Sequence, residues 1–122
     1  MSVNKIYLLG RLTKDPEYKL MENGRGLCQF SIATNHDYTK KDTGERVSKA
    51  TFHNIRVWGT MAKKSDEVLK KGSKVFIEGK QEHEQYESNN GEKKYYSYVT
   101  CKYIQFLDAK EEKSFKNENF NV

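Results

Sequence analysis

The sequence has 122 residues, 32% of them charged, and a net charge of +5 at pH 7, which fits one compact domain with a short terminal segment and suits an anionic partner. No stretch approaches the roughly 18 consecutive apolar residues of a membrane span. The two cysteines, Cys28 and Cys101, lack CxxC spacing and a nearby histidine cluster, so we expect buried, reduced thiols in a cytoplasmic protein, and neither a metal nor another cofactor.

Five segments predict strands: the first is rich in aliphatic residues, and in the second Cys28, Phe30 and Ile32 alternate with Gln29, Ser31 and Ala33. Between the first and the second, the segment Tyr18–Met21 can extend the pairing before the turn signal Asn23-Gly24. The fourth strand can continue as far as Tyr86. The five strands are expected, in chain order, at Val3–Leu12, Leu27–Tyr38, Val47–Gly59, Lys74–Gly79 and Lys93–Leu107.

One helix is expected between the third and fourth strands. Thr60 has the residue type of an N-cap, and Gly72 is placed to end the helix. The residues at helical spacing are Met61, Ser65, Val68 and Leu69. Three strands, a helix and two strands match the order of the OB-fold, a five-stranded, partly open barrel that often binds oligonucleotides or oligosaccharides. We therefore predict an all-β OB-fold domain over residues 1–107 and a flexible tail over residues 108–122.

The third predicted strand carries two different faces. Ile55 and Val57 fall on one face and are expected in the core, because side chains alternate along a strand. The other face combines aromatic, amide and cationic groups: Phe52, Asn54, Arg56 and Trp58. Aromatic rings stack on unpaired bases and cations meet phosphates, so this face predicts a surface for single-stranded nucleic acid. The alternative is that Phe52 and Trp58 cover a neighbouring subunit or the helix.

Further aromatic and basic residues extend this pattern. Tyr38 ends the second strand beside a basic loop, and Tyr86 ends the fourth; with Phe52 and Trp58 they form the predicted set of base-stacking residues. The tyrosines of the fifth strand, Tyr95, Tyr96, Tyr98 and Tyr103, are expected mostly as cross-strand packing partners. Phosphate contacts are predicted for Lys5, Arg11, Lys40, Lys41, Arg46, Lys49, Arg56 and Lys71.

Residues 3–107 resemble the bacterial-type single-stranded DNA-binding proteins. The resemblance rests on segments that occur in the same order: Val3-Asn-Lys-Ile6, Gly10 with Asp15-Pro-Glu17, Asn23-Gly24, Phe30-Ser-Ile-Ala-Thr34, Asp42-Thr-Gly-Glu45, Thr51-Phe-His53, Trp58-Gly59 and Leu69–Gly79. It implies a homotetramer that binds single-stranded DNA without sequence preference in replication, recombination and repair. The subunits would join through their first strands, which include Tyr7, and His53 would lie near a subunit contact.

The sequence departs from that family in two places. Glu82, Glu84 and Gln85 precede Tyr86 where the family is usually basic, and this makes the site less favourable to phosphate. The chain ends Asn119-Phe-Asn-Val122 rather than in an acidic tip with a terminal Pro-Phe. Recruitment of replication or repair proteins through the tail, by Phe120, is therefore only a hypothesis.

An enzyme and a protein-interaction module are the two alternatives to a DNA-binding protein. An enzyme would need a nucleophile cluster, a phosphate-binding glycine loop or grouped carboxylates, and His36, His53 and His83 are scattered. We therefore expect no enzymatic activity. An OB-fold protein-interaction module, such as a primosome-type accessory factor, stays open as the alternative to DNA binding.

Overall fold

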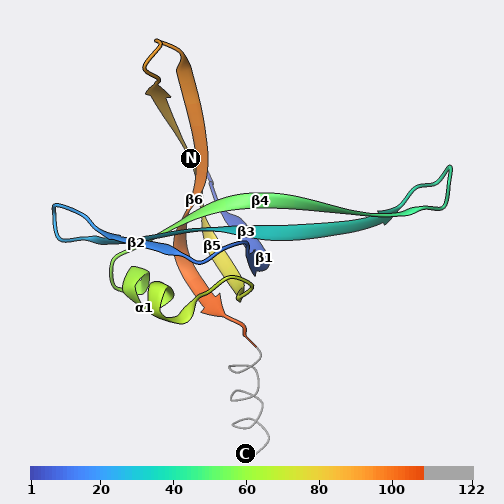
Figure 1. Ribbon diagram of the computed structural model, residues 1–122, viewed down its shortest axis with the longest axis horizontal. Coiled ribbons are helices and arrows are strands. Elements are labelled where there is room, and N and C mark those ends of the chain that lie inside the picture. The colour runs from blue at the N-terminus through green and yellow to red at the C-terminus, as the bar shows by residue number, and fades with distance from the viewer. Residues whose placement is uncertain (109–122) are drawn as a thin grey trace, which may run out of the picture.

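The computed structural model describes residues 1–108, in which six strands form one sheet that closes into a barrel (Figure 1). α1 is the only helix within these residues, and it is neither long nor apolar enough to cross a membrane. The elements are β1 (Ile6–Leu12), β2 (Glu17–Leu20), β3 (Gly26–Thr39), β4 (Arg46–Trp58), α1 (Thr60–Val68), β5 (Lys74–Glu87) and β6 (Lys93–Phe106).

The sheet runs in the order β1-β5-β6-β4-β3-β2. β1 also pairs with β3, where Arg11 lies opposite Ala33, and this second pairing joins five strands into a ring. β2 pairs only with β3 and stands outside the ring as the short extension expected for Tyr18–Met21. The predicted five-stranded OB-fold barrel is confirmed, and the β1–β3 seam closes it rather than leaving it partly open.

Strand alternation builds the core as the sequence predicted. Cys28, Phe30 and Ile32 of β3 are buried, and so are Ile55 and Val57 of β4. The polar residues that alternate with them, Gln29 and Ser31 on β3 and Asn54 and Arg56 on β4, are more exposed, because successive side chains of a strand point to opposite faces. β1, β5, β6 and the helix region add the rest of the core: Leu8, Leu12, Ala62, Leu69, Val75, Ile77, Val99 and Ile104.

The start of α1 differs from the expectation. Gly59, not Thr60, is the N-cap, and no side chain caps the helix. Gly59 adopts φ 80°, a conformation that favours glycine, and its N–H donates to the Gly26 carbonyl of β3 at 2.9 Å. This turn carries the chain from the end of β4 directly into the helix, so Thr60 is already the first helical residue.

The helix is also shorter and buries a different face than predicted. It ends at Val68, because Leu69 is extended and its side chain enters the core. Gly72, at φ 91°, shapes the later turn into β5. Ser65 is buried as expected, but its buried partner is Ala62, whereas Met61 and Val68 are exposed.

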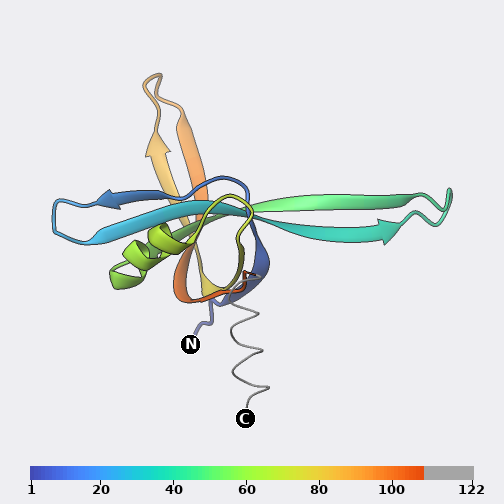
Figure 2. The same ribbon diagram turned by 60° about the horizontal axis from the view of Figure 1, so that its bottom comes forward.

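Two long hairpins project from the barrel in different directions (Figures 1 and 2). The outer parts of β3 and β4 form the first arm, which ends in a turn over residues 40–45. The outer parts of β5 and β6 form the second arm, which ends near Gly91. A register shift at Glu78/Gly79 interrupts the β5–β6 ladder near the barrel. The arms extend the molecular surface well beyond a single small barrel.

Candidate nucleic-acid interface

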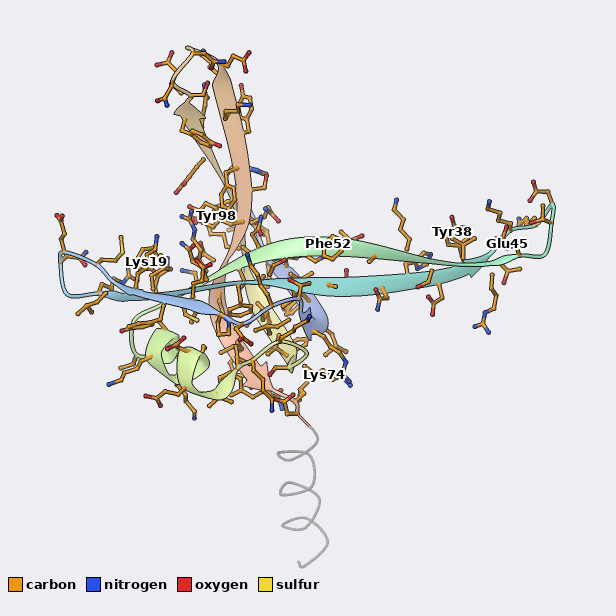
Figure 3. All side chains as sticks on the ribbon, in the orientation of Figure 1. Lys19, Tyr38, Glu45, Phe52, Lys74 and Tyr98 are labelled. Atoms are coloured by element: carbon orange, nitrogen blue, oxygen red, sulfur yellow. The ribbon has the colours of Figure 1, made fainter. Side chains whose placement is uncertain are left out.

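The outer face of β4 is the centre of the candidate interface. Phe52 is 66% exposed, and Arg56 and Trp58 follow on the same face while Ile55 and Val57 point into the core. Figure 3 shows Phe52 on β4 between the barrel and the first arm. Cations and flat rings therefore alternate with buried aliphatic residues along one strand, as the sequence indicated.

β6 adds two tyrosines to this face. The parallel β4–β6 pairing sets Arg56 opposite Thr100, so Tyr96 and Tyr98, which share the face of Thr100, lie beside Arg56. The Arg56 Cζ is 3.9 Å from the Tyr98 ring centre and 5.4 Å from that of Tyr96. We expected these tyrosines mainly as packing partners within the hairpin. Their position beside β4 depends on a parallel contact that no local pattern reveals.

Arg56 is not a free cation. Its Nη1 donates to Glu84 Oε1 of β5 at 2.9 Å, and its side chain is only 18% exposed. Tyr98 donates its hydroxyl to the same Glu84 oxygen at 3.3 Å. Burial and the nearby carboxylates of Glu84 and Glu82 raise the pKa of Tyr98, so its hydroxyl stays a donor at neutral pH.

Two hollows flank this face. One, of about 340 Å³, lies at the base of the second arm, where Phe52, Asn54 and Tyr95 are among its lining residues. The other, of about 230 Å³, is lined by Trp58, Met61 and Lys102, among others. Hollows beside aromatic rings suit flat groups such as bases, whose faces can stack on a ring.

Trp58 has a cationic partner that sequence reasoning missed. The Arg25 Cζ lies 4.8 Å from the centre of the Trp58 ring. Arg25 belongs to the turn between β2 and β3, next to the Asn23-Gly24 signal, and the β3–β4 register brings this turn to the end of β4. Only knowledge of that register could have identified the pair.

The remaining predicted stacking residues lie on the arms. Tyr38 is 42% exposed near the end of the first arm and stacks on His36 at 5.8 Å. It falls on the face of β3 that bears Phe30 and Ile32, whereas Phe52 pairs with Ala33 on the opposite face. Tyr86 is 54% exposed near the end of β5. The structure therefore distributes the four aromatics over both arms and the barrel and does not bring them into one cluster.

Apart from Arg56, the predicted phosphate contacts separate into two regions. Four of them lie on the first arm with Tyr38: Lys40, Lys41, Arg46 and Lys49. Lys40 is 4.0 Å from Glu45, and the other three form no ion pair within residues 1–108. Lys5, Arg11 and Lys71 are instead near β1: Lys5 pairs with Glu78 at 3.1 Å, and Arg11 donates to the Gly72 carbonyl at 3.0 Å. Arg11 is nevertheless close to the β4 face, because it lies opposite Ala33 of β3, which pairs with Phe52.

The two residues expected at a subunit contact also lie apart. Tyr7 is 58% exposed on β1 and stacks on Phe76 of β5, with 6.1 Å between ring centres. His53 points to the core side of β4, and its Nε2 is 3.0 Å from the Thr34 hydroxyl. Burial lowers the pKa of His53, so the ring is held neutral.

The cysteines are built into the barrel. Cys28 is fully buried, and burial raises the pKa of its thiol to about 12. Burial raises that of Cys101 to about 11, and its Sγ donates to the Tyr103 carbonyl. Within residues 1–108, no group of three or more His, Cys, Asp or Glu side chains gathers as a metal site.

Comparisons with known proteins agree with this architecture. The Plasmodium falciparum SSB in complex with ssDNA superposes with a TM-score of 0.80 and 31% identity, covering 88% of this chain and 97% of that one. A deletion mutant of the single-stranded DNA binding protein from Thermus aquaticus gives a TM-score of 0.76 and 28% identity, covering 88% and 51%.

Curated sequences give the same relationship. Single-stranded DNA-binding proteins from two strains of Neisseria meningitidis are 38% identical over 91 residues, and the chain spans 52% of their length. Single-stranded DNA-binding protein 1 of Xylella fastidiosa is 32% identical over 111 residues, which are 91% of this chain and 82% of that protein. Residues 3–107 match the single-strand binding protein family as a whole. The chain therefore belongs to the single-strand binding protein family.

Proposed function

We propose that this protein binds and protects single-stranded DNA without sequence preference, as a non-enzymatic cytoplasmic protein of replication, recombination and repair. The observation that carries the proposal is the exposed β4 face, where Phe52 and Trp58 alternate with polar and cationic side chains. Family membership and the similarity to an SSB bound to ssDNA support it.

The chemistry of this surface favours unpaired strands. A base in a duplex is stacked on both sides by its neighbours, whereas an unpaired base can offer its face to a ring, and each such contact is worth roughly 1–3 kcal/mol. Every base has such a face, so binding would not depend on sequence. The lysines and arginines of the first arm would follow the phosphates of the flexible strand.

Trp58 provides the test because it is the only tryptophan. We expect its fluorescence to fall on addition of oligo(dT) and to change little with the same amount of duplex. Phe52→Ala should weaken binding at least about fivefold, the lower end expected for one lost stack. Val68→Ala, which truncates an exposed apolar side chain on α1, is the matched control. Equal quenching by duplex would contradict the stacking of Trp58 on unpaired bases. No quenching by oligo(dT) would contradict it as well and would support the protein-interaction module instead.

We further propose that the protein assembles as a homotetramer through β1. The outer faces of β1 and β6 expose Tyr7, Leu9 and Tyr103, and the half-buried Phe76 of β5 lies beside them. An apolar patch of this kind on a small domain favours contact with another subunit. His53→Tyr should weaken the assembly if His53 packs near a subunit contact, because a larger ring overpacks a fitted interface.

A further inference from the structure

Two donors from different strands converge on one oxygen of Glu84. Arg56 Nη1 of β4 lies 2.9 Å from Glu84 Oε1, and the Tyr98 hydroxyl of β6 lies 3.3 Å from the same atom. The guanidinium is held 3.9 Å above the Tyr98 ring. Figure 3 shows Tyr98 at the base of the second arm, close to β4. A cation and a hydroxyl fixed in this way form a small site for an oxyanion.

We infer that Arg56 and Tyr98 form a subsite for a backbone phosphate of single-stranded DNA, which the Glu84 carboxylate occupies in the free protein. Carboxylate and phosphate oxygens accept the same charge-assisted hydrogen bonds from arginine, so one can replace the other on the same donors. The inference rests on the proposed DNA binding and assigns to Glu84 the role of an internal competitor.

The structure allows this exchange. The Glu84 side chain is 49% exposed and stands on the second arm, so it can turn away into water. Arg56 is 18% exposed and packed on the tyrosine ring, so the cation stays in place when its partner leaves. Its Nε is buried and has no hydrogen-bond partner within the described residues, which leaves one further donor of the guanidinium unused.

The neighbouring Glu82 does not share this role. Its carboxylate accepts a hydrogen bond from the Thr100 hydroxyl and pairs with Lys80 at 3.3 Å. The hydrogen bond from Thr100 lowers the pKa of Glu82 most, with a further contribution from Lys80. The sequence placed Glu82 and Glu84 together as groups that oppose phosphate, whereas within residues 1–108 only Glu84 pairs with Arg56. The Tyr98 hydroxyl also helps to lower the pKa of Glu82.

Glu84→Gln tests the subsite, with Glu87→Gln as the matched control. Both substitutions remove one negative charge from the second arm, but Glu87 lies on the other face of β5 and forms no ion pair within residues 1–108. Binding of oligo(dT) is measured by anisotropy of a labelled strand over a range of salt concentrations. Glu84→Gln should tighten binding up to about fivefold and steepen the salt dependence by up to about 0.7. Glu87→Gln should change the affinity and the salt dependence much less.

An Arg56→Met background completes the test. If Glu84 competes through Arg56, the gain from Glu84→Gln should fall there to that of Glu87→Gln. The inference is overturned if Glu84→Gln weakens binding, tightens it no more than Glu87→Gln, or tightens it equally without Arg56. These outcomes require that the unmodified protein binds oligo(dT). Absence of binding by that protein contradicts the proposed function itself.

Discussion

At the scale of single residues, burial sets the chemistry of the titratable groups in the barrel. Cys28 and Cys101 have raised pKa values and His53 a lowered one, with desolvation as the largest cause in each case. Desolvation disfavours the charged form of any group. The thiols are therefore held protonated and the imidazole neutral, and both states can be tested in solution.

The thiols should not react in the folded protein. Thiolates are the reactive species, and pKa values of about 12 and about 11 leave almost none at a working pH of about 8. We expect Ellman's reagent to modify neither cysteine quickly until urea unfolds the barrel, with the partly exposed Cys101 reacting before Cys28. Rapid modification of native Cys28 would mean that the barrel opens readily.

His53 should make folding sensitive to acid. Its pKa in the folded state lies below the ordinary value of 6.5, so between the two values the unfolded chain binds more protons. Its contribution to stability is complete above 6.5 and is lost as the pH falls below that value. Urea midpoints at about pH 8 and about pH 5 should differ less in His53→Gln than in the unmodified protein. His36→Gln, on the exposed arm, should keep the unmodified difference.

At the scale of elements, the arms determine which aromatics one strand can reach. Tyr38 pairs with Val47 and Phe52 with Ala33, so they lie five residues apart along the β3–β4 ribbon and on opposite faces. At about 3.3 Å per residue, this separation is about 17 Å. A strand bound along the outer face of the barrel would therefore contact Phe52 and would need extra length to pass around the ribbon to Tyr38.

Oligonucleotide length should separate these two residues. Tyr38→Ala should weaken binding of a strand of about 35 nucleotides and leave one of about 8 nucleotides nearly unchanged, because a single OB-fold covers about 4–16. Phe52→Ala should weaken both at least about fivefold. Anisotropy titrations of the two strands give the comparison. Equal losses for Tyr38→Ala on both strands would place Tyr38 in the central contact.

At the scale of the whole molecule, substitutions on the apolar outer face of β1 test whether the protein is a single barrel or an assembly of barrels. Leu9 is 52% exposed at its centre, next to the Tyr7–Phe76 stack. We expect Leu9→Lys to dissociate the proposed tetramer in light scattering, because it places a charge in an apolar contact. Leu20→Lys, on exposed β2, is the control and should leave the mass unchanged. A monomeric unmodified protein at micromolar concentration would contradict the assembly.

The tail prediction concerns residues 109–122, which lie outside the described part of the structure, as does the hypothesis about Phe120. Their acidic and basic residues nearly balance, so they should compete poorly with DNA for the basic arm. Asp108, the last described residue, accepts a hydrogen bond from the Lys74 N–H. Deleting residues 109–122 should change affinity for a long oligonucleotide less than tenfold. A larger change would show that the tail contacts the binding face.

The sequence by itself determined the barrel and the face that carries the candidate site. The alternation of side chains in β3 and β4 separates the core residues Phe30, Ile32 and Ile55 from the outer residues Phe52 and Arg56. This alternation can be predicted without knowing the partner strand, because a strand alternates its faces regardless of what it pairs with. The order of strands and helix then identified the OB-fold. The helix boundaries were less predictable, because Gly59 and Leu69 follow tertiary contacts rather than helix propensity.

Only the tertiary structure decided what each side chain touches. The parallel β4–β6 contact brings Arg56 onto Tyr98, and the β5–β6 pairing adds Glu84; these residues are 42 and 28 positions away in the sequence. The β3–β4 register likewise brings Arg25 to Trp58. Pairing across a barrel is set by closure of the whole sheet, which a local pattern does not contain. The sequence could therefore locate a cation on the binding face, whereas the fold determined that a carboxylate already holds it.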